Sequence, residues 1–443
     1  MNRLMALCLW GLAGCFSPLV VEGTHCSDKG ECPPQLTCVE GVCRLPGTVA
    51  DAAPPDASLP AIADARERVA DAPPDAPPPA DAPPNGPPPA DAPPNGPPWV
   101  GVTAGSNNGC ALHRSGKVVC WGDNHLGQLG TGPASAIAAP GVVQGIDDAV
   151  EIVSGQQATC ARRASGAVSC WGYSTVAGND QFAASGTPKE VPGVTDAVSV
   201  AMTGKHACVR RSSGLTQCWG SNSHGEVGNG ATSTAGTFTP SDVGLPAAAI
   251  DVHAGAIHTC AALPAPHGLA CWGFNNQGQL GDGTTMDAHF PRETSIRDVL
   301  MVAPGYSFTC GLLSNSTVSC WGNGDSGQLG DGMLTSSPSP VSVSGLGDVV
   351  KLSAAQDYAC AIVVTGGVWC WGTMDAGSPT KIVPAQIQGV ANAVAVSVGG
   401  NASCALDGDS RVYCWGDDGY GELGDGVSRF GFFPATEIPL PQL

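Results

Sequence analysis

Residues 110–122 read Cys110-Ala111-Leu112-His113-Arg114-Ser115-Gly116-Lys117-Val118-Val119-Cys120-Trp121-Gly122, and the same pattern returns six more times in the 443-residue chain. Its fixed parts are a first cysteine, nine or ten intervening residues and a closing Cys-Trp-Gly. The closing triplets begin at Cys120, Cys170, Cys218, Cys271, Cys320, Cys370 and Cys414. The first cysteines are Cys110, Cys160, Cys208, Cys260, Cys310, Cys360 and Cys404. Seven copies identify a repeat protein.

The repeat period predicts the architecture. Successive first cysteines are separated by 50, 48, 52, 50, 50 and 44 residues. The short apolar segments and the 61 glycines suit β-strands joined by tight turns. A period near fifty is the length of a four-stranded propeller blade, and seven blades can close a ring. Residues 99–443 are therefore predicted to form an all-β, seven-bladed β-propeller with four-stranded blades.

The cysteine spacing also predicts a hairpin within each repeat. If Cys110 lies opposite Cys120, residues 114–116 form a three-residue loop whose last position has a positive φ, which favours glycine. The equivalent positions are Gly166, Gly214, Gly366, Ser316 and Ser410, and the Cys260 repeat has one extra residue around Pro264-Ala265-Pro266. Four glycines among seven repeats favour this hairpin register.

The two cysteines of each repeat are expected to form a disulfide. The expected pairs are Cys110–Cys120, Cys160–Cys170, Cys208–Cys218, Cys260–Cys271, Cys310–Cys320, Cys360–Cys370 and Cys404–Cys414. Each would close a loop of about eleven residues, which the chain-entropy model values at about 3 kcal/mol. The alternative is that the cysteines are unbonded and act as small buried apolar side chains.

Charge and cysteine content limit the function classes. The net charge is −19, and from Trp99 onward 14 Lys and Arg residues face 26 acids, so binding to a nucleic-acid phosphate backbone is not expected. Twenty cysteines are typical of a chain that matures in an oxidising compartment.

The amino terminus predicts export and a lipid anchor. Arg3 precedes an apolar run from Leu4 to Ala13, which is long enough for a signal-peptide core and too short to span a bilayer. The run ends at Gly14-Cys15 in a sequence that resembles the bacterial lipoprotein signal, so residues 1–15 are interpreted as a signal peptide and Cys15 as the lipidated residue. An ordinary cleavage site is the alternative. Phe16 favours the outer membrane or cell surface, by the same resemblance, with the lipid as the only membrane contact.

Two further segments separate this signal from the propeller. Residues 16–46 form a small Cys-rich module whose four cysteines, Cys26, Cys32, Cys38 and Cys43, can pair in three ways as two disulfides, with a zinc site as the alternative. Residues 47–98 are rich in Pro, Ala and Asp and repeat one decapeptide at 79–88 and 89–98. We expect them to be a disordered linker of up to about 150 Å when extended, or a ligand for a proline-reading domain.

A second motif follows the closing triplet in five repeats and carries a family resemblance. It reads Gly127-Gln128-Leu129-Gly130-Thr131-Gly132 in the first repeat, and near variants begin at Gly225, Gly278, Gly327 and Gly421. Together with Trp121-Gly122-Asp123-Asn124, it resembles the regulator-of-chromosome-condensation repeat, which implies the same seven-bladed propeller. His206 and His258 match a recurrent histidine of that repeat, and recurrence at one position favours a packing role.

The sequence also departs from this family pattern. The repeats around Tyr173–Thr187 and Thr373–Pro379 lack the Gly-Gln-Leu-Gly segment, so the second and sixth blades are expected to have altered loops. The nucleotide-exchange role of the founding member rests on features outside the repeat and is not carried over. Other members act as protein-binding platforms, among them a secreted bacterial inhibitor of β-lactamases.

Local motifs for catalysis or metal binding have simpler explanations. Residues 324–327 (Gly-Asp-Ser-Gly) resemble a serine-protease segment but occupy a turn of the repeat, and the acids at 407–409 and 417–418 lack a complete calcium loop. No catalytic residue, metal site or cofactor is therefore predicted.

The expected function is binding. We expect a monomeric, surface-anchored, non-catalytic scaffold whose loops bind a protein or a surface glycan. The alternatives are an enzyme inhibitor, with the aromatics Tyr173, Phe182, Phe274, Tyr306 and Tyr420 gathered on one face, and an enzyme with a pocket on the central axis.

Overall fold

The computed structural model describes residues 37–39, 42–44, 98–173, 184–374 and 380–443. In the amino-terminal unit it describes a short antiparallel pair, β1 (Thr37–Val39) and β2 (Val42–Arg44), in which Cys38 lies opposite Cys43. Cys15, Cys26, Cys32, the signal peptide, the linker up to residue 97 and the altered loops of the second and sixth blades lie outside the described residues. No helix in the described part of the chain is long and apolar enough to cross a membrane.

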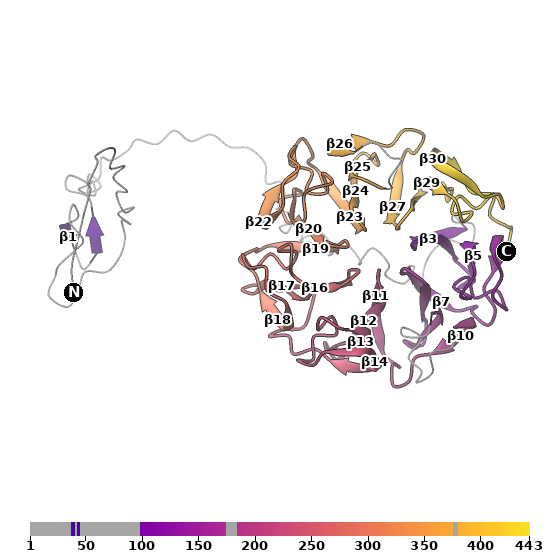
Figure 1. The fold of residues 1–443 in the computed structure, drawn as a ribbon, viewed down its shortest axis with the longest axis horizontal. Coiled ribbons are helices and arrows are strands. Elements are labelled where there is room, and N and C mark those ends of the chain that lie inside the picture. Colours follow the sequence, from indigo (N-terminus) through magenta and orange to yellow (C-terminus); the bar gives the residue numbers. More distant parts are fainter. Residues whose placement is uncertain (1–36, 40–41, 45–97, 174–183, 375–379) are drawn as a thin grey trace, which may run out of the picture. The chain divides into compact units, whose positions relative to one another are not determined.

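From Trp99 onward the chain forms seven four-stranded antiparallel sheets around a central axis (Figure 1). The first four blades consist of β3 (Trp99–Ala104), β4 (Asn108–His113), β5 (Val118–Asp123) and β6 (Ile137–Val142); β7 (Ala149–Ser154), β8 (Ala158–Arg163), β9 (Val168–Gly172) and β10 (Ser185–Glu190); β11 (Ala197–Met202), β12 (His206–Arg211), β13 (Thr216–Asn222) and β14 (Ser233–Asp242); and β15 (Asp251–Ala254), β16 (His258–Leu263), β17 (Gly268–Gly273) and β18 (Ala288–Glu293). The last three consist of β19 (Val299–Pro304), β20 (Phe308–Leu313), β21 (Val318–Gly322) and β22 (Ser337–Ser342); β23 (Val349–Ala355), β24 (Tyr358–Val363), β25 (Val368–Gly372) and β26 (Lys381–Gln386); and β27 (Ala393–Val398), β28 (Ala402–Asp407), β29 (Val412–Asp418) and β30 (Arg429–Glu437). The predicted fold class is confirmed.

Each blade is built from consecutive strands, with the first strand innermost and the fourth outermost. The turns between strands one and two and the loops between strands three and four lie at one end of the blades, which we call the turn face. The hairpin loops between strands two and three and the connections between blades lie at the other end, the hairpin face. Because β3 begins at the hairpin end, the propeller chain starts on the hairpin face, beside the axis.

The hairpins have the register expected from the cysteine spacing. Cys110 lies opposite Cys120, and the His113 N–H donates to the Lys117 carbonyl at 2.9 Å, which leaves residues 114–116 as the loop. Gly116 has a φ of 83°. Ser316 and Ser410 adopt φ values of 63° and 64° at the same position, so the positive φ belongs to the turn even where glycine is replaced.

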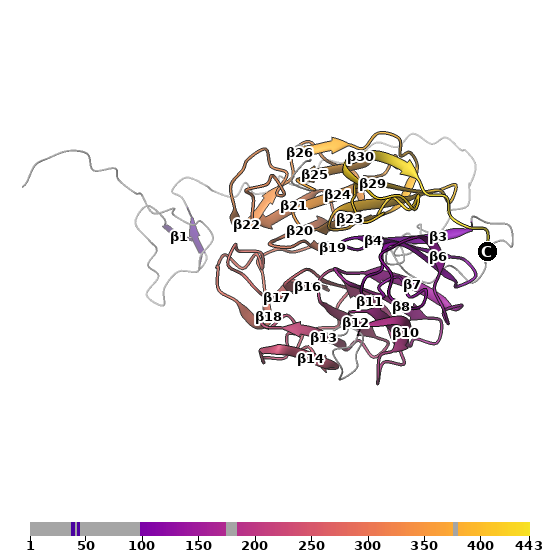
Figure 2. The same cartoon turned by 45° about the vertical axis from the view of Figure 1, so that its right-hand side comes forward.

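The ring closes without exchanging a strand between its two ends. The first and last blades are each complete, and they lie side by side in Figures 1 and 2. At this seam the Gly400 N–H donates to the Gly105 carbonyl at 3.1 Å and the Ala104 N–H donates to Ser397 Oγ at 2.9 Å. The interior seams use the same turn-to-turn bond, as from Ser106 N–H to the Gly155 carbonyl at 3.2 Å. Closure therefore uses the same kind of contact as the interior seams.

The two sequence motifs meet between blades. The tryptophans of all seven Cys-Trp-Gly triplets are fully buried. Trp171 lies against Gly130 of the preceding blade, where a Cβ atom would stand 2.7 Å from its indole nitrogen, and Gly130 has a φ of 68°. Both the lack of space for a Cβ atom and the positive φ require glycine at position 130. The Gly-Gln-Leu-Gly segment of one blade is thus the packing surface for the tryptophan of the next.

Candidate functional site

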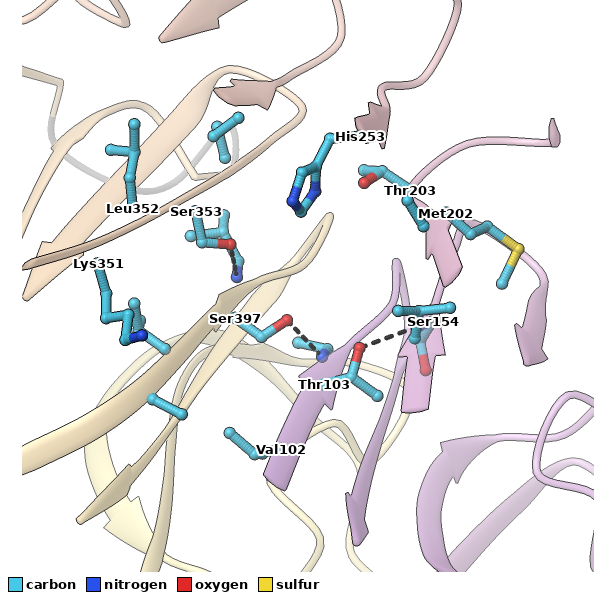
Figure 3. A pocket seen from close by; sticks show the side chains of 18 of the residues that line it. Val102, Thr103, Ser154, Met202, Thr203, His253, Lys351, Leu352, Ser353 and Ser397 are labelled. Atoms are coloured by element: carbon cyan, nitrogen blue, oxygen red, sulfur yellow. Dashed lines mark hydrogen bonds between the residues drawn. The ribbon is translucent and has the colours of Figure 1, made fainter. Parts of the chain in front are cut away.

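The seven innermost strands enclose a cavity of about 90 Å³ on the propeller axis (Figure 3). Its wall is mostly aliphatic, with Val102, Ile152, Leu352 and Val396 among the lining residues. Toward the turn face it narrows to a space of about 10 Å³ between the turns, which shares Ala104, Thr203 and Val398 with it. The cavity is therefore small and largely enclosed.

Hydroxyl groups in the wall join neighbouring innermost strands. The acceptor is a serine or threonine at one repeat position, and the donor is the backbone N–H of the next blade (Figure 3). The pairs are Thr103 Oγ1 with Ser154 N at 2.9 Å, Ser353 Oγ with Val398 N at 3.0 Å, and Ser397 Oγ with Ala104 N at 2.9 Å. These bonds satisfy N–H groups on the free edges of innermost strands.

Closer to the hairpin face, buried carboxylates also accept hydrogen bonds from the backbone N–H groups of the next blade. Glu151 Oε2 accepts from the Val200 N–H at 3.3 Å and from Arg162 Nε at 2.7 Å, and burial raises the pKa of Glu151 despite the opposing effect of Arg162. Asp251 Oδ2 accepts from the Val302 N–H at 3.4 Å. Both acids bridge blades, which is a structural role.

His253 is the lining residue most able to act on a ligand. Its Nε2 lies 3.4 Å from Asp251 Oδ2, and its side chain is 33% exposed to the axial space, into which the ring points (Figure 3). Burial opposes protonation, but Asp251 and Glu151 outweigh that effect and raise the pKa of His253 above its usual value. The charged form of the imidazole that faces the cavity is thus favoured relative to that of a free histidine.

The described residues contain no group of three or more His, Cys, Asp or Glu side chains that could hold a metal ion. The segment at residues 324–327 is a turn, in which the Gly327 N–H donates to the Gly324 carbonyl at 2.9 Å. Asp407 pairs with Arg411 at 2.7 Å, and Asp418 pairs with Arg429 at 3.0 Å. The acids at 407–409 and 417–418 therefore support turns and ion pairs.

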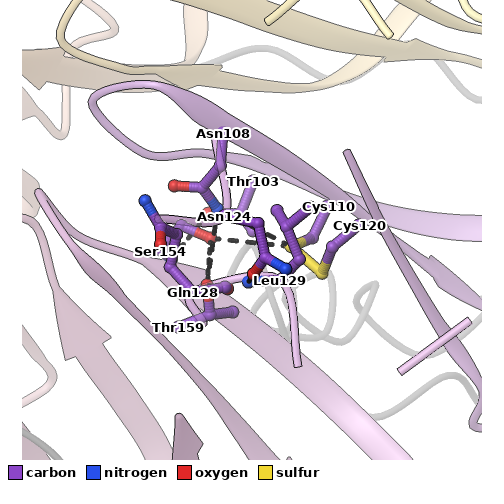
Figure 4. Close-up of a disulfide and its surroundings, with 9 residues drawn as sticks. All are labelled: Thr103, Asn108, Cys110, Cys120, Asn124, Gln128, Leu129, Ser154 and Thr159. Carbon is purple, nitrogen blue, oxygen red and sulfur yellow. Dashed lines mark hydrogen bonds between the residues drawn. A yellow bond between two sulfur atoms is a disulfide. The ribbon is translucent and has the colours of Figure 1, made fainter. Parts of the chain in front are cut away.

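The seven expected cysteine pairs are bonded in the structure, with Cα atoms 4.0 to 4.1 Å apart. Figure 4 shows the first disulfide beside a series of hydrogen bonds that joins the first and second blades. Asn108 Nδ2 donates to Thr159 Oγ1 at 3.4 Å, and that hydroxyl donates to the Gln128 carbonyl at 3.0 Å. The cysteine side chains are all but inaccessible to solvent, so the disulfides are structural.

His206 and His258 occupy the Asn108 position in their blades and pack between blades. Because the Thr259 hydroxyl donates to the Glu226 carbonyl at 2.8 Å, the 2.7 Å bond between His206 Nε2 and Thr259 Oγ1 must be donated by the imidazole. Burial lowers the pKa of His206 to about 4 and that of His258 to about 3, so both rings are neutral near pH 7. The expected packing role fits this geometry.

Several aromatic and methionine side chains are exposed on the turn face. Met286, Phe290 and Met333 are 63%, 61% and 60% exposed, on or beside the loops between strands three and four of the neighbouring fourth and fifth blades. Tyr306 and Tyr420, expected from the sequence as contact residues, are also exposed on this face. Phe274 stacks on His224 with ring centroids 4.4 Å apart, Tyr173 is half-buried, and Phe182 lies outside the described residues.

The hairpin face carries a different apolar feature. Each blade has one aliphatic side chain, exposed or half-buried, at the hairpin end of its innermost strand. In six blades it is the second residue of the strand, at a β-bulge, and in the fourth blade it is the residue just before β15. These residues are Val100, Val150, Val198, Ile250, Leu300, Val350 and Val394. They lie at the hairpin end of the innermost strands, the end at which the first of these strands begins, and are called the aliphatic ring below.

Family models match this repeat pattern. Two models of the regulator of chromosome condensation (RCC1) repeat match the chain, one over residues 115–162, 214–262, 269–312 and 317–362 and the other over residues 99–128, 302–328 and 393–422. Together they cover more than half of it. The chain belongs to the RCC1 repeat family. The stretches between these matches include the two repeats of this RCC1-type propeller that lack the Gly-Gln-Leu-Gly segment.

Solved structures share the RCC1-type fold. Yeast RCC1 (Prp20), in a crystal structure with bound Kap60, has 19% identity and a TM-score of 0.64 over 73% of this chain and 83% of that one. Prp20p from Saccharomyces cerevisiae, described with its binding to Gsp1p and histones, has 19% identity and a TM-score of 0.62 over 76% and 86%. Human WBSCR16 has 19% identity and a TM-score of 0.64 over 73% and 95%. A search of curated proteins returned no match.

Sequence reasoning did not find the axial site of this RCC1-type propeller. His253 stands at the repeat position held by Thr103, Ser353 and Ser397 in other blades. Aligning the innermost strands of the repeats would have shown one ionisable residue among hydroxyl and aliphatic ones. The signal was present, but it lay outside the cysteine motif.

Proposed function

We propose that the protein is a non-catalytic binding scaffold, held by a lipid on Cys15 at the outer membrane or cell surface, that binds a protein partner through the turn face of its propeller. The observation that carries this proposal is the exposure of Met286, Phe290 and Met333 on the turn face of the fourth and fifth blades. Aromatic and methionine side chains are enriched in the cores of protein interfaces.

The direction of the chain favours the turn face over the aliphatic ring. The Pro98 carbonyl accepts from the Arg114 N–H at 2.8 Å, so the segment that joins the propeller to the proposed anchor enters on the hairpin face. The turn face lies at the opposite end of the blades from this entry point at Pro98. The proposed anchor itself rests on the signal-like sequence that ends at Cys15.

Paired surface variants test the binding proposal. The purified protein is used to retain partners from cell-surface extracts, and Phe290→Ser combined with Met333→Ser should reduce the retained protein at least tenfold. The matched control is Val364→Ser, which removes a 69% exposed side chain on the hairpin face and should leave retention unchanged. Equal losses in both variants, or turnover of an ester, phosphate or glycoside substrate at enzyme-like rates, would contradict the proposal.

The anchor is tested separately. Cells fed radiolabelled palmitate should label the wild-type protein and not the Cys15→Ser variant, and the variant should move from the membrane fraction to the soluble one. If the Cys15→Ser variant is still labelled, the proposed lipid anchor at Cys15 is wrong, whereas the proposed binding face is not tested by this result.

A further inference from the structure

The charges that line the axial cavity are of one sign. His253 and Lys351 are the only ionisable residues in its wall, and both are bases. The nearest carboxylates do not line the cavity: Glu151 is engaged by Arg162 and the Val200 N–H, and Asp251 by the Val302 N–H and His253. In a protein with a net charge of −19, this interior space therefore selects against cations.

The backbone of the wall also offers donors. Ser or Thr occupies the bridging position in three blades, but Val153, Ala201 and Ala303 occupy it in three others and have no side-chain oxygen to offer. In the blades that follow Val153 and Ala303, the N–H groups that would donate to this position belong to Met202 and Ala354. No described side chain accepts from either N–H group, and both residues line the cavity. Strand-edge N–H groups of this kind require an acceptor from water or from a ligand.

In the fourth blade His253 occupies the bridging position, and its ring forms no hydrogen bond to a described residue of the next blade. The residue in the next blade that would donate to the bridging position is Pro304, which has no N–H. His253 Nε2 is directed to Asp251, and no described residue hydrogen-bonds to its Nδ1. The imidazole is thus held by one nitrogen and exposed to the cavity without a bridging partner.

We propose that the axial cavity binds a short-chain aliphatic carboxylate, with its carboxylate group on His253 and its hydrocarbon part against the aliphatic wall. The volume of about 90 Å³ is well below the roughly 300–1,000 Å³ of pockets for drug-sized ligands, which favours a ligand of a few heavy atoms. Aliphatic side chains such as Val102 and Ile152 favour a hydrocarbon chain over a fully hydrated oxyanion. This site is independent of the proposed turn-face interface.

The probe is propionate, compared with propionamide, which has nearly the same shape and no charge, and with inorganic phosphate. The full-length protein is labelled at histidine, and the imidazole resonances are followed by NMR during titration. Propionate should shift the His253 signals in a saturable manner, with an affinity at least ten times that for propionamide or phosphate. An unshifted His253 signal, or equal binding of propionamide or phosphate, would overturn the proposal.

Three variants locate the site. His253→Ser should weaken propionate at least tenfold, and the fold tolerates serine here because Ser353 and Ser397 hold the same position in other blades. Ala303→Val, which copies Val153, should weaken it by filling the cavity while His253 remains. The control is His267→Gln, a histidine paired with Glu293 outside the cavity, which should bind as wild type. Binding that survives both cavity variants would place the ligand elsewhere.

Binding should also depend on pH. The groups that face His253 are Asp251 on its own strand, Glu151 from β7, which pairs with Arg162 at 2.7 Å, and Arg210 from β12. The affinity for propionate should fall as the pH rises through the pKa of His253, because the ring loses its charge. An affinity that does not change between pH 5.5 and pH 9 would show that the imidazole does not hold the carboxylate.

Discussion

Trp121 Nε1 donates a hydrogen bond of 2.8 Å to the backbone carbonyl of Glu422, 301 positions away in the sequence. This bond crosses the seam where the first and last blades meet. The same bond joins Trp321 to the Gln279 carbonyl at 3.0 Å in the interior of the ring. The seam that closes the ring is thus chemically equivalent to an interior one.

Trp121→Phe and Trp321→Phe should therefore destabilise the protein to a similar extent. Each loses a buried hydrogen bond and leaves a cavity, at a cost of about 2–4 kcal/mol in the free energy of unfolding. Urea unfolding followed by circular dichroism measures both. A separate early transition in Trp121→Phe alone would show that the closing seam is weaker than the geometry indicates.

Glu422 should make the propeller less stable at high pH. Burial raises the pKa of Glu422 to about 8, and its Oε1 has no hydrogen-bond partner among the described residues. Because the folded state holds this proton more tightly than the unfolded state does, stability is fully present below about pH 4.5 and is lost as the pH rises toward 8.

Glu422→Gln should remove this loss, since glutamine occupies the same motif position at Gln128, Gln279 and Gln328. We expect a gain on the order of 2–3 kcal/mol at pH 8.5 and little change at pH 5, measured by urea unfolding. The control is Glu226→Gln, because Glu226 Oε1, unlike Glu422 Oε1, accepts hydrogen bonds from Ser221 and Ser223. A larger gain at pH 5 than at pH 8.5 would refute the buried proton.

The interior disulfides should resist reagents until the fold opens. Cys310 and Cys320 are fully buried, so alkylation of the native protein under reducing conditions should be slow and should accelerate sharply in denaturant. Replacing both by alanine should lower the free energy of unfolding by about 3 kcal/mol. Rapid native-state modification, detected by mass spectrometry, would show that the blades open locally.

The buried histidines should make the propeller sensitive to acid. His206 and His258 have folded-state pKa values of about 4 and about 3, below the usual 6.5, so the stability that they support above pH 6.5 is lost as the pH falls toward those values. His258→Asn, which copies Asn108, should reduce the loss between pH 6.5 and pH 4. His267→Gln, at a partly exposed site, should not change it.

The sequence predicted the parts of the fold that every repeat must share. Glycine at position 116 and its equivalents marked the hairpin turn, because that turn requires a positive φ, and the cysteines marked the register. The constraint is local, so a few residues reveal it. The strand assignment followed from seven copies of one pattern.

The site was not predictable in the same way. His253, Glu151 and Lys351 lie on innermost strands at positions that vary among blades, and they meet only after seven distant segments form a ring. The burial of Glu422 likewise depends on tertiary packing that joins the two ends of the chain. Within a single repeat nothing distinguishes these residues from solvent-exposed ones, and His253 stands out only when the innermost strands of all seven repeats are aligned.

Each blade is an uninterrupted stretch of about fifty residues that borrows no strand from elsewhere in the chain. A recombination event between neighbouring repeats of the gene would therefore add, delete or replace a complete wedge, and a wedge that carries the Gly-Gln-Leu-Gly segment would still present its glycine to the tryptophan of a new neighbour. Such a molecule can acquire a new set of surface loops one wedge at a time, while the contacts that bend the row of sheets into a circle are inherited intact.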